Sequence, residues 1–130
     1  MKKKKTMTRI NVGVLPKELS DKHLLAEHRE IKRIPNMVAS GKAKIEGIPE
    51  KFTLGRGHVK FFYNKLRYLY FRYCEIHKEC TKRGFNVTDY SQAFFQEFPN
   101  HKQLWKDYKE KPEDREIILQ RINERLTGVK

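Results

Sequence analysis

The stretch from His58 to Arg83 contains neither proline nor glycine, and it constrains the fold more than any other part of the chain. Large side chains recur along it at spacings of three and four residues, the period of one helix face. They are Val59, Phe62, Tyr63, Leu66, Leu69, Tyr70, Tyr73, Ile76 and Cys80. The stretch therefore predicts one long core helix that ends at Gly84. Its aromatic residues could also form a base-stacking surface, but the helical spacing favours packing in a core.

A shorter helix is predicted nearer the amino end. It starts at Pro16 or Ser20, where Ser20 can cap it, and Pro35 stops it after about Ile34. Residues 1 to about 15 are expected to form an arm with a short extended piece, INVGVL. Glycine and proline residues recur between the first helix and the core helix, which predicts a short helix near NMVASGK followed by a loop.

A last helix is predicted from Pro112 to Gly128, because acidic residues occupy its first turn. Its inner face consists of Ile118, Ile122 and Leu126, and Arg121 and Arg125 flank that face. The segment before it is expected to be irregular, with Trp105 in the core. A chain of 130 residues is the size of one domain. We therefore predict an all-α fold: a single compact domain of about three main helices, with an N-terminal arm and long irregular connections.

The charge of the chain points to a polyanionic partner. Its 29 Lys and Arg residues exceed its 16 Asp and Glu residues and give a formal net charge of +13. Nucleic acid and an anionic membrane surface both fit this balance. No stretch approaches the roughly 18 apolar residues of a membrane span, and no signal peptide is recognisable, so we expect a soluble cytoplasmic protein.

Neither cysteines nor histidines form a metal-binding pattern. Cys74 and Cys80 fall on different faces of the predicted core helix, which favours reduced thiols over a disulfide. The histidines occur without an HExxH or CxxC companion. We therefore expect no metal site.

One side of the first predicted helix carries His23, Glu27 and Glu30, at spacings i, i+4 and i+7. Composition alone favours a solvated surface for such a stripe. However, Arg29 and Arg33 lie beside it, so the helix presents cations suited to phosphates next to carboxylates suited to acid–base chemistry. Carboxylates repel a polyanion, and their presence on a face that binds DNA favours a catalytic role.

Four blocks of the sequence, in this order, resemble the pyrimidine-dimer DNA glycosylases typified by phage endonuclease V. The blocks are MTRIN at Met7–Asn11, DKHLLAEHREIKR at Asp21–Arg33, FTLGRGHVKFFYNKL at Phe52–Leu66 and ECTKRGFN at Glu79–Asn86. A weaker resemblance covers Pro112–Leu126. Four ordered blocks make a specific match.

The resemblance implies a compact helical enzyme that acts on double-stranded DNA with damaged or abasic sites, as a monomer and without cofactor, metal or membrane. Such enzymes cleave the glycosyl bond of a pyrimidine dimer and then nick the strand as an abasic-site lyase. By resemblance, the amino group of an N-terminal Thr8 is the nucleophile and Glu30 is the catalytic carboxylate. The DNA-binding residues implied are Arg9, His23, Arg29 and Arg33, with Arg121 and Arg125 matched less closely.

This chemistry needs a free amine on Thr8, so we expect translation to begin at Met7 or the preceding residues to be removed. Residues 1–7 are then a basic N-terminal extension, disordered or a start-site artefact, and residues 8–130 form a single helical DNA-repair domain. The family's aromatic, basic tail is replaced here by LTGVK. Two alternatives are an abasic-site lyase without dimer specificity and a non-enzymatic helical DNA-binding module.

Overall fold

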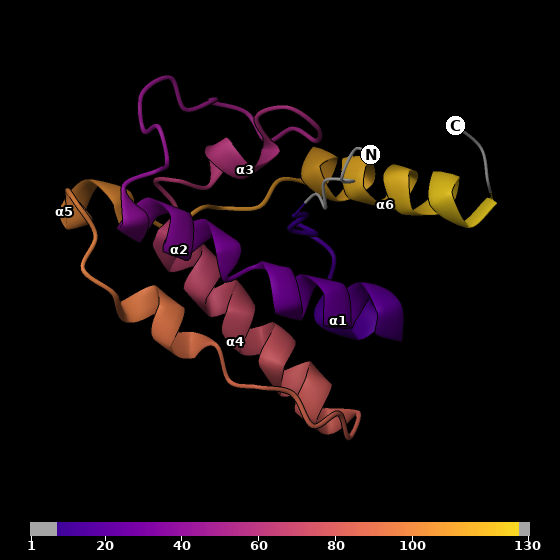
Figure 1. The fold of residues 1–130 in the computed structure, drawn as a ribbon. Coiled ribbons are helices and arrows are strands. Elements are labelled where there is room, and N and C mark those ends of the chain that lie inside the picture. Colours follow the sequence, from indigo (N-terminus) through magenta and orange to yellow (C-terminus); the bar gives the residue numbers. More distant parts are fainter. Residues whose placement is uncertain (1–7, 128–130) are drawn as a thin grey trace, which may run out of the picture.

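The computed structural model describes the backbone of residues 8–127 and the side chains of residues 8–124. The predicted extension 1–7 and the side chain of Arg125 lie outside these ranges. The described chain is helical and contains no strand, which confirms the predicted all-α fold (Figure 1). Its elements, with η for short 3-10 helices, are η1 (Pro16–Glu18), α1 (Asp21–Glu30), α2 (Arg33–Ser40), α3 (His58–Phe61), α4 (Leu66–Lys82), η2 (Ser91–Phe95), α5 (His101–Leu104) and α6 (Pro112–Thr127).

Helix α4 is the longest element within residues 8–127 and lies against α1, η1 and η2. Its buried apolar side chains are Leu66, Tyr68, Leu69, Tyr73, Ile76 and Cys80. The prediction that the aromatic residues pack in a core is therefore correct for most of this helix, and Phe71 is the exception, being 49% exposed. Both cysteines are free, with Cys74 exposed and Cys80 buried.

The predicted core helix is broken in two, between α3 and α4. Residue Lys65 leaves the helical conformation with φ −128° and ψ 41°, and its Nζ donates to the carbonyl of Phe61 over 3.0 Å. The turn continues through the three aromatic residues before the break, because Phe62 N–H donates to Val59 and Tyr63 N–H donates to Lys60. Phe61, Phe62 and Tyr63 are all buried. The predicted end is confirmed, since Gly84 has φ +86° and its N–H donates to Thr81.

The first predicted helix also ends early. Its cap is confirmed, because the Ser20 hydroxyl accepts from the backbone N–H of His23 over 3.2 Å. However, α1 ends at Glu30, and Pro35 does not stop it but lies in the first turn of α2. Proline is tolerated there because N–H groups of a first turn have no partner within the helix.

The predicted N-terminal arm is instead part of the core from Ile10 onward. Ile10, Val12 and Val14 are at most 1% exposed. The INVGVL segment turns rather than extends, since Val12 N–H donates to Ile10 and Val14 N–H donates to Asn11. Burial of these three apolar side chains contributes hydrophobic stabilisation that an exposed arm would not have. The segment passes between α1 and α6 (Figure 1).

The carboxyl-terminal part is more ordered than expected, because η2 and α5 lie in the segment predicted to be irregular. Trp105 is half-buried and packs against the core, as predicted. On α6, Ile118 is fully buried and Ile122 packs partly against the core. Within residues 8–127, no helix has the length and apolar character that a membrane crossing requires.

Candidate active site

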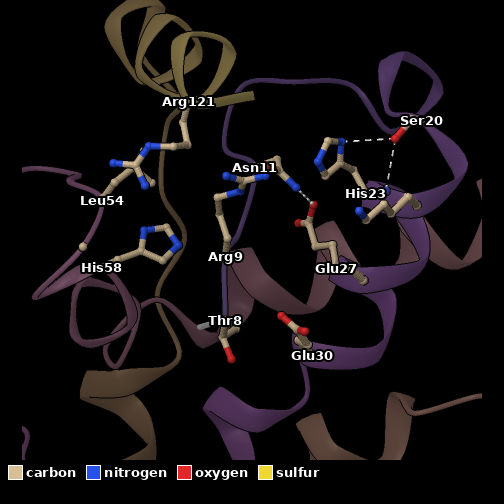
Figure 2. Close-up of a pocket in the computed structure, with 13 residues that line it drawn as sticks. Thr8, Arg9, Asn11, Ser20, His23, Glu27, Glu30, Leu54, His58 and Arg121 are labelled. Carbon is tan, nitrogen blue, oxygen red and sulfur yellow. Dashed lines mark hydrogen bonds between the residues drawn. The ribbon is translucent and has the colours of Figure 1, made fainter. Parts of the chain in front are cut away.

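A cavity of about 340 Å³ lies between the amino-terminal segment, α1, the loop before α3, and α6 (Figure 2). Six of the residues singled out from the sequence line it: Thr8, Arg9, His23, Glu27, Glu30 and Arg121. They come from segments far apart in the chain, so folding brings them together. In Figure 2, Thr8 and Glu30 lie at one end of the cavity and Arg121 at the other.

Thr8 and Glu30 are both largely enclosed, with exposures of 8% and 6%. Thr8 and Glu30 are each contacted by an arginine that does not itself line the cavity. Arg33 Nη1 donates to Thr8 Oγ1 at 3.5 Å, and Arg29 Nη2 lies 3.5 Å from Glu30 Oε2. Both arginines are exposed. The structure therefore places Arg29 and Arg33 at the rim of the site rather than among the residues that line it.

Glu27, which the sequence placed in the same polar stripe as Glu30, is a buried structural residue. It is 1% exposed and receives two hydrogen bonds from Arg72 of α4, with Nε at 2.7 Å and Nη2 at 2.9 Å. Asn11 Nδ2 donates to the same carboxylate at 2.6 Å. Arg72 also donates to the carbonyl of Val14 at 2.7 Å. Glu27 thus ties the amino-terminal segment to α1 and α4 and is occupied by these bonds.

The cavity also contains His58, which sequence reasoning missed. It is 2% exposed, and both of its ring nitrogens have backbone partners. Nε2 accepts from Ile10 N–H at 2.9 Å, and Nδ1 lies 2.8 Å from the carbonyl of Thr53, to which it can only donate. Burial lowers the pKa of His58, which favours this neutral ring. No spacing in the sequence signals bonds to backbone atoms of other segments.

A model of the pyrimidine dimer DNA glycosylase family matches residues 7–92. The chain belongs to this family. The resemblance seen in the four sequence blocks is thereby confirmed, and the protein is a glycosylase of DNA repair, with DNA as its substrate. The matched range includes Thr8, Glu30 and His58, whereas Arg121 on α6 lies beyond it.

The cations of this glycosylase are well placed for phosphates at the cavity. Arg9, Lys22 and Arg121 line it, and the exposed Arg29 and Arg33 stand beside it. Arginine contacts of this kind position a DNA backbone without reading its sequence. Lys22 was not singled out in the sequence, because one lysine in so basic a chain carries no signal. Among the described residues, no group of three or more His, Cys, Asp or Glu side chains could hold a metal ion.

Proposed function

We propose that this glycosylase cleaves the glycosyl bond of the 5′ base of a pyrimidine dimer and then nicks the strand as an abasic-site lyase, with the amine of an N-terminal Thr8 as nucleophile. The observation that carries this proposal is that Thr8 and Glu30 line one cavity bordered by arginines. A nucleophile, a carboxylate and phosphate-binding groups around one space are what this chemistry needs.

The α-amine is the best nitrogen nucleophile that a protein without cofactor offers near neutral pH. Its reference pKa is about 7.7–8.0, against about 10.4 for lysine, so its uncharged fraction is roughly a few hundred times larger. An uncharged amine has the free electron pair that attack on carbon requires. A terminal Thr8 would present that group inside the cavity.

The reaction begins when the amine nitrogen bonds to C1′ of the sugar. The glycosyl bond breaks, its electron pair leaves with the base, and the base takes up a proton. The C1′–O4′ bond then breaks and opens the sugar ring, one proton passes from the nitrogen to O4′, and a Schiff base between the nitrogen and C1′ remains. The Schiff base acidifies the C2′ proton, so that removal of this proton expels the 3′ phosphate by β-elimination. Glu30 stabilises positive charge on the sugar and assists the proton transfers.

Access to C1′ requires bending of the duplex and displacement of a nucleotide, at a cost of a few kcal/mol that is lowest at a poorly stacked lesion. Contacts from Arg9, Arg29, Arg33 and Arg121 to phosphates offset this cost, with Arg125 as a further contact in the proposal. The enzyme then works as a monomer on damaged or abasic duplex, without metal or cofactor.

Borohydride trapping tests the proposal, because borohydride reduces a Schiff base to a stable covalent adduct. Protein that starts at Thr8 is incubated with a dimer-containing duplex and with an abasic duplex. Adducts on both support the full proposal, and an adduct on the abasic duplex alone indicates a lyase without dimer specificity. No adduct on either duplex indicates a DNA-binding module and contradicts the proposal. The control is the same protein with its α-amine acetylated, which should give no adduct.

N-terminal sequencing of the native protein tests the requirement for a free amine. The proposal expects a chain that begins with Thr8. A native chain that still begins MKKKK would contradict it, since Thr8 would then have only an amide nitrogen.

A further inference from the structure

His58 links two walls of the cavity through backbone groups alone. Its Nε2 accepts from Ile10 N–H in the amino-terminal segment, and its Nδ1 donates to the Thr53 carbonyl in the loop before α3. Phe52 and Phe62 contact the ring edge-on, with centroids 5.4 and 5.3 Å away. Hydrogen bonds and packing therefore fix the ring in one orientation.

The bond to Ile10 restrains the chain close to its proposed reactive end. A peptide unit is planar, so fixing the N–H of Ile10 also fixes the carbonyl of Arg9. Only the backbone torsions of Thr8 and Arg9 then remain to direct the nitrogen of Thr8. The next residue, Asn11, restrains the segment a second time, because its side chain donates to the buried carboxylate of Glu27.

We propose that His58 is a positioning residue for the reaction: its bond to Ile10 holds the Thr8 amine toward Glu30 inside the cavity. This inference rests on the proposed function. Orientation contributes strongly to attack by a bound group, and misplacement by about 1 Å can lower a rate about 100-fold. Neither nitrogen of His58 bonds substrate or moves a proton in this proposal, since both are engaged by backbone groups.

Two amide substitutions separate the two hydrogen bonds of His58. The side-chain amide of His58→Gln reaches the position of Nε2 and can still accept from Ile10 N–H. That of His58→Asn reaches only the position of Nδ1 and can still donate to Thr53. Each variant keeps one bond and loses the other. We expect His58→Gln to trap abasic DNA within about 3-fold of the wild-type single-turnover rate, and His58→Asn to be about 10- to 100-fold slower, with DNA affinity unchanged within about 3-fold.

The matched control is His28→Asn. His28 is also a buried histidine, 3% exposed, but it bonds Tyr73 and does not line the cavity. It should trap at the wild-type rate. If His28→Asn and His58→Asn are slowed equally, the effect is a general loss of stability and the inference is wrong. If the wild type traps DNA and His58→Asn traps it as fast, the inference fails while the proposed function stands. If the wild type traps nothing, the proposed function fails.

A measurement on the unaltered protein keeps the inference testable if His58→Asn does not fold. An N–H···N hydrogen bond transmits a scalar coupling between its two nitrogens, which NMR detects. We expect this coupling between Ile10 N and His58 Nε2 in the protein bound to an uncleavable abasic-analogue duplex. Its absence in that complex would overturn the inference, because the bond must persist while the amine attacks.

Discussion

Glu27 and Glu30 lie one turn apart on α1 and both line the cavity, but their partners differ. Glu27 is bonded to Arg72 and Asn11, whereas Glu30 lies 3.5 Å from the exposed Arg29. A buried carboxylate with a bidentate arginine partner is strongly destabilising when only one partner is removed. In the proposed mechanism Glu30 is available for chemistry, because its ion-pair partner Arg29 is exposed rather than buried.

The first prediction contrasts two isosteric substitutions on this helix. Glu30→Gln should lower dimer cleavage by at least about 100-fold and change the free energy of unfolding by less than about 1 kcal/mol. Glu27→Gln should lower that free energy by about 3–5 kcal/mol, because it leaves the Arg72 guanidinium buried without its counter-charge. Urea unfolding and a cleavage assay measure the two effects. Normal cleavage by Glu30→Gln would show that its proposed role is wrong.

At the scale of single residues, the sequence predicted side chains that line the cavity better than it predicted the hydrogen-bond partners that hold those side chains in place. Thr8, Arg9, His23 and Glu30 lie in the blocks that resemble the family, Arg121 lies in the weaker resemblance, and all five line the cavity. The hydrogen-bond partners of Glu27 and His58 were not predicted. Arg72 lies 45 positions from Glu27 in the sequence, and His58 bonds to backbone atoms. A backbone partner has no residue identity that a sequence could reveal.

At the scale of elements, signals carried by neighbouring residues predicted two helix ends correctly, whereas the stop expected at Pro35 was wrong. The Ser20 cap and the Gly84 termination depend on a few adjacent residues, and the structure confirms both. The break between α3 and α4 could not be predicted in this way. The chain leaves the helical conformation at Lys65, after three adjacent aromatic residues, 61–63, that are buried against partners elsewhere in the chain. The helical period of the stretch continues across the break and so conceals it.

The second prediction concerns how α6 docks against the amino-terminal segment. Gly13 has φ +83°, and a Cβ added there would lie 2.9 Å from Arg115 Cβ, so α6 or the segment would have to move. Gly41 has φ +84° with open space around it. Gly41→Ala should cost about 1–2 kcal/mol for the left-handed backbone alone. Gly13→Ala should cost at least about 1 kcal/mol more and should weaken DNA binding, because α6 carries Arg121.

Thermal unfolding and DNA titration of both alanine variants check this prediction. Equal losses of stability would mean that the contact between Gly13 and Arg115 does not set the position of α6. If the Gly13→Ala protein is less stable but binds DNA with wild-type affinity, DNA binding does not depend on how α6 docks, and that part of the prediction is wrong.

At the scale of the whole molecule, the third prediction is that stability falls as pH falls below about 6.5. Burial lowers the pKa of His28 and of His58 in the folded protein. The unfolded chain, with histidine pKa values near 6.5, therefore binds protons first as pH falls, and protons favour the unfolded state. The stabilisation is complete above about pH 6.5 and is lost toward the lowered folded values.

Urea unfolding at pH 7.5, 6.5 and 5.5 measures this dependence. The window is chosen to avoid Glu18, whose pKa the hydrogen bond from Arg115 lowers to about 2, so that its contribution is lost only below its ordinary value of 4.5. A His28→Gln variant should show a shallower decline than the wild type. A stability that stays constant or rises from pH 7.5 to 5.5 would contradict the prediction.

The fourth prediction concerns the net charge of +13 and where it meets DNA. A cation that neutralises a phosphate releases counterions from the DNA. Each such contact makes the slope of log affinity against log salt concentration steeper by about 0.9. Arg121 lines the cavity, whereas Lys78 is exposed on α4 and does not. Arg121→Gln should therefore lower this slope by about one for damaged duplex, and Lys78→Gln should leave it unchanged. Equal slopes for both variants would mean that the positive charge attracts DNA to the whole surface. The proposal that the cavity binds the DNA backbone would then be wrong.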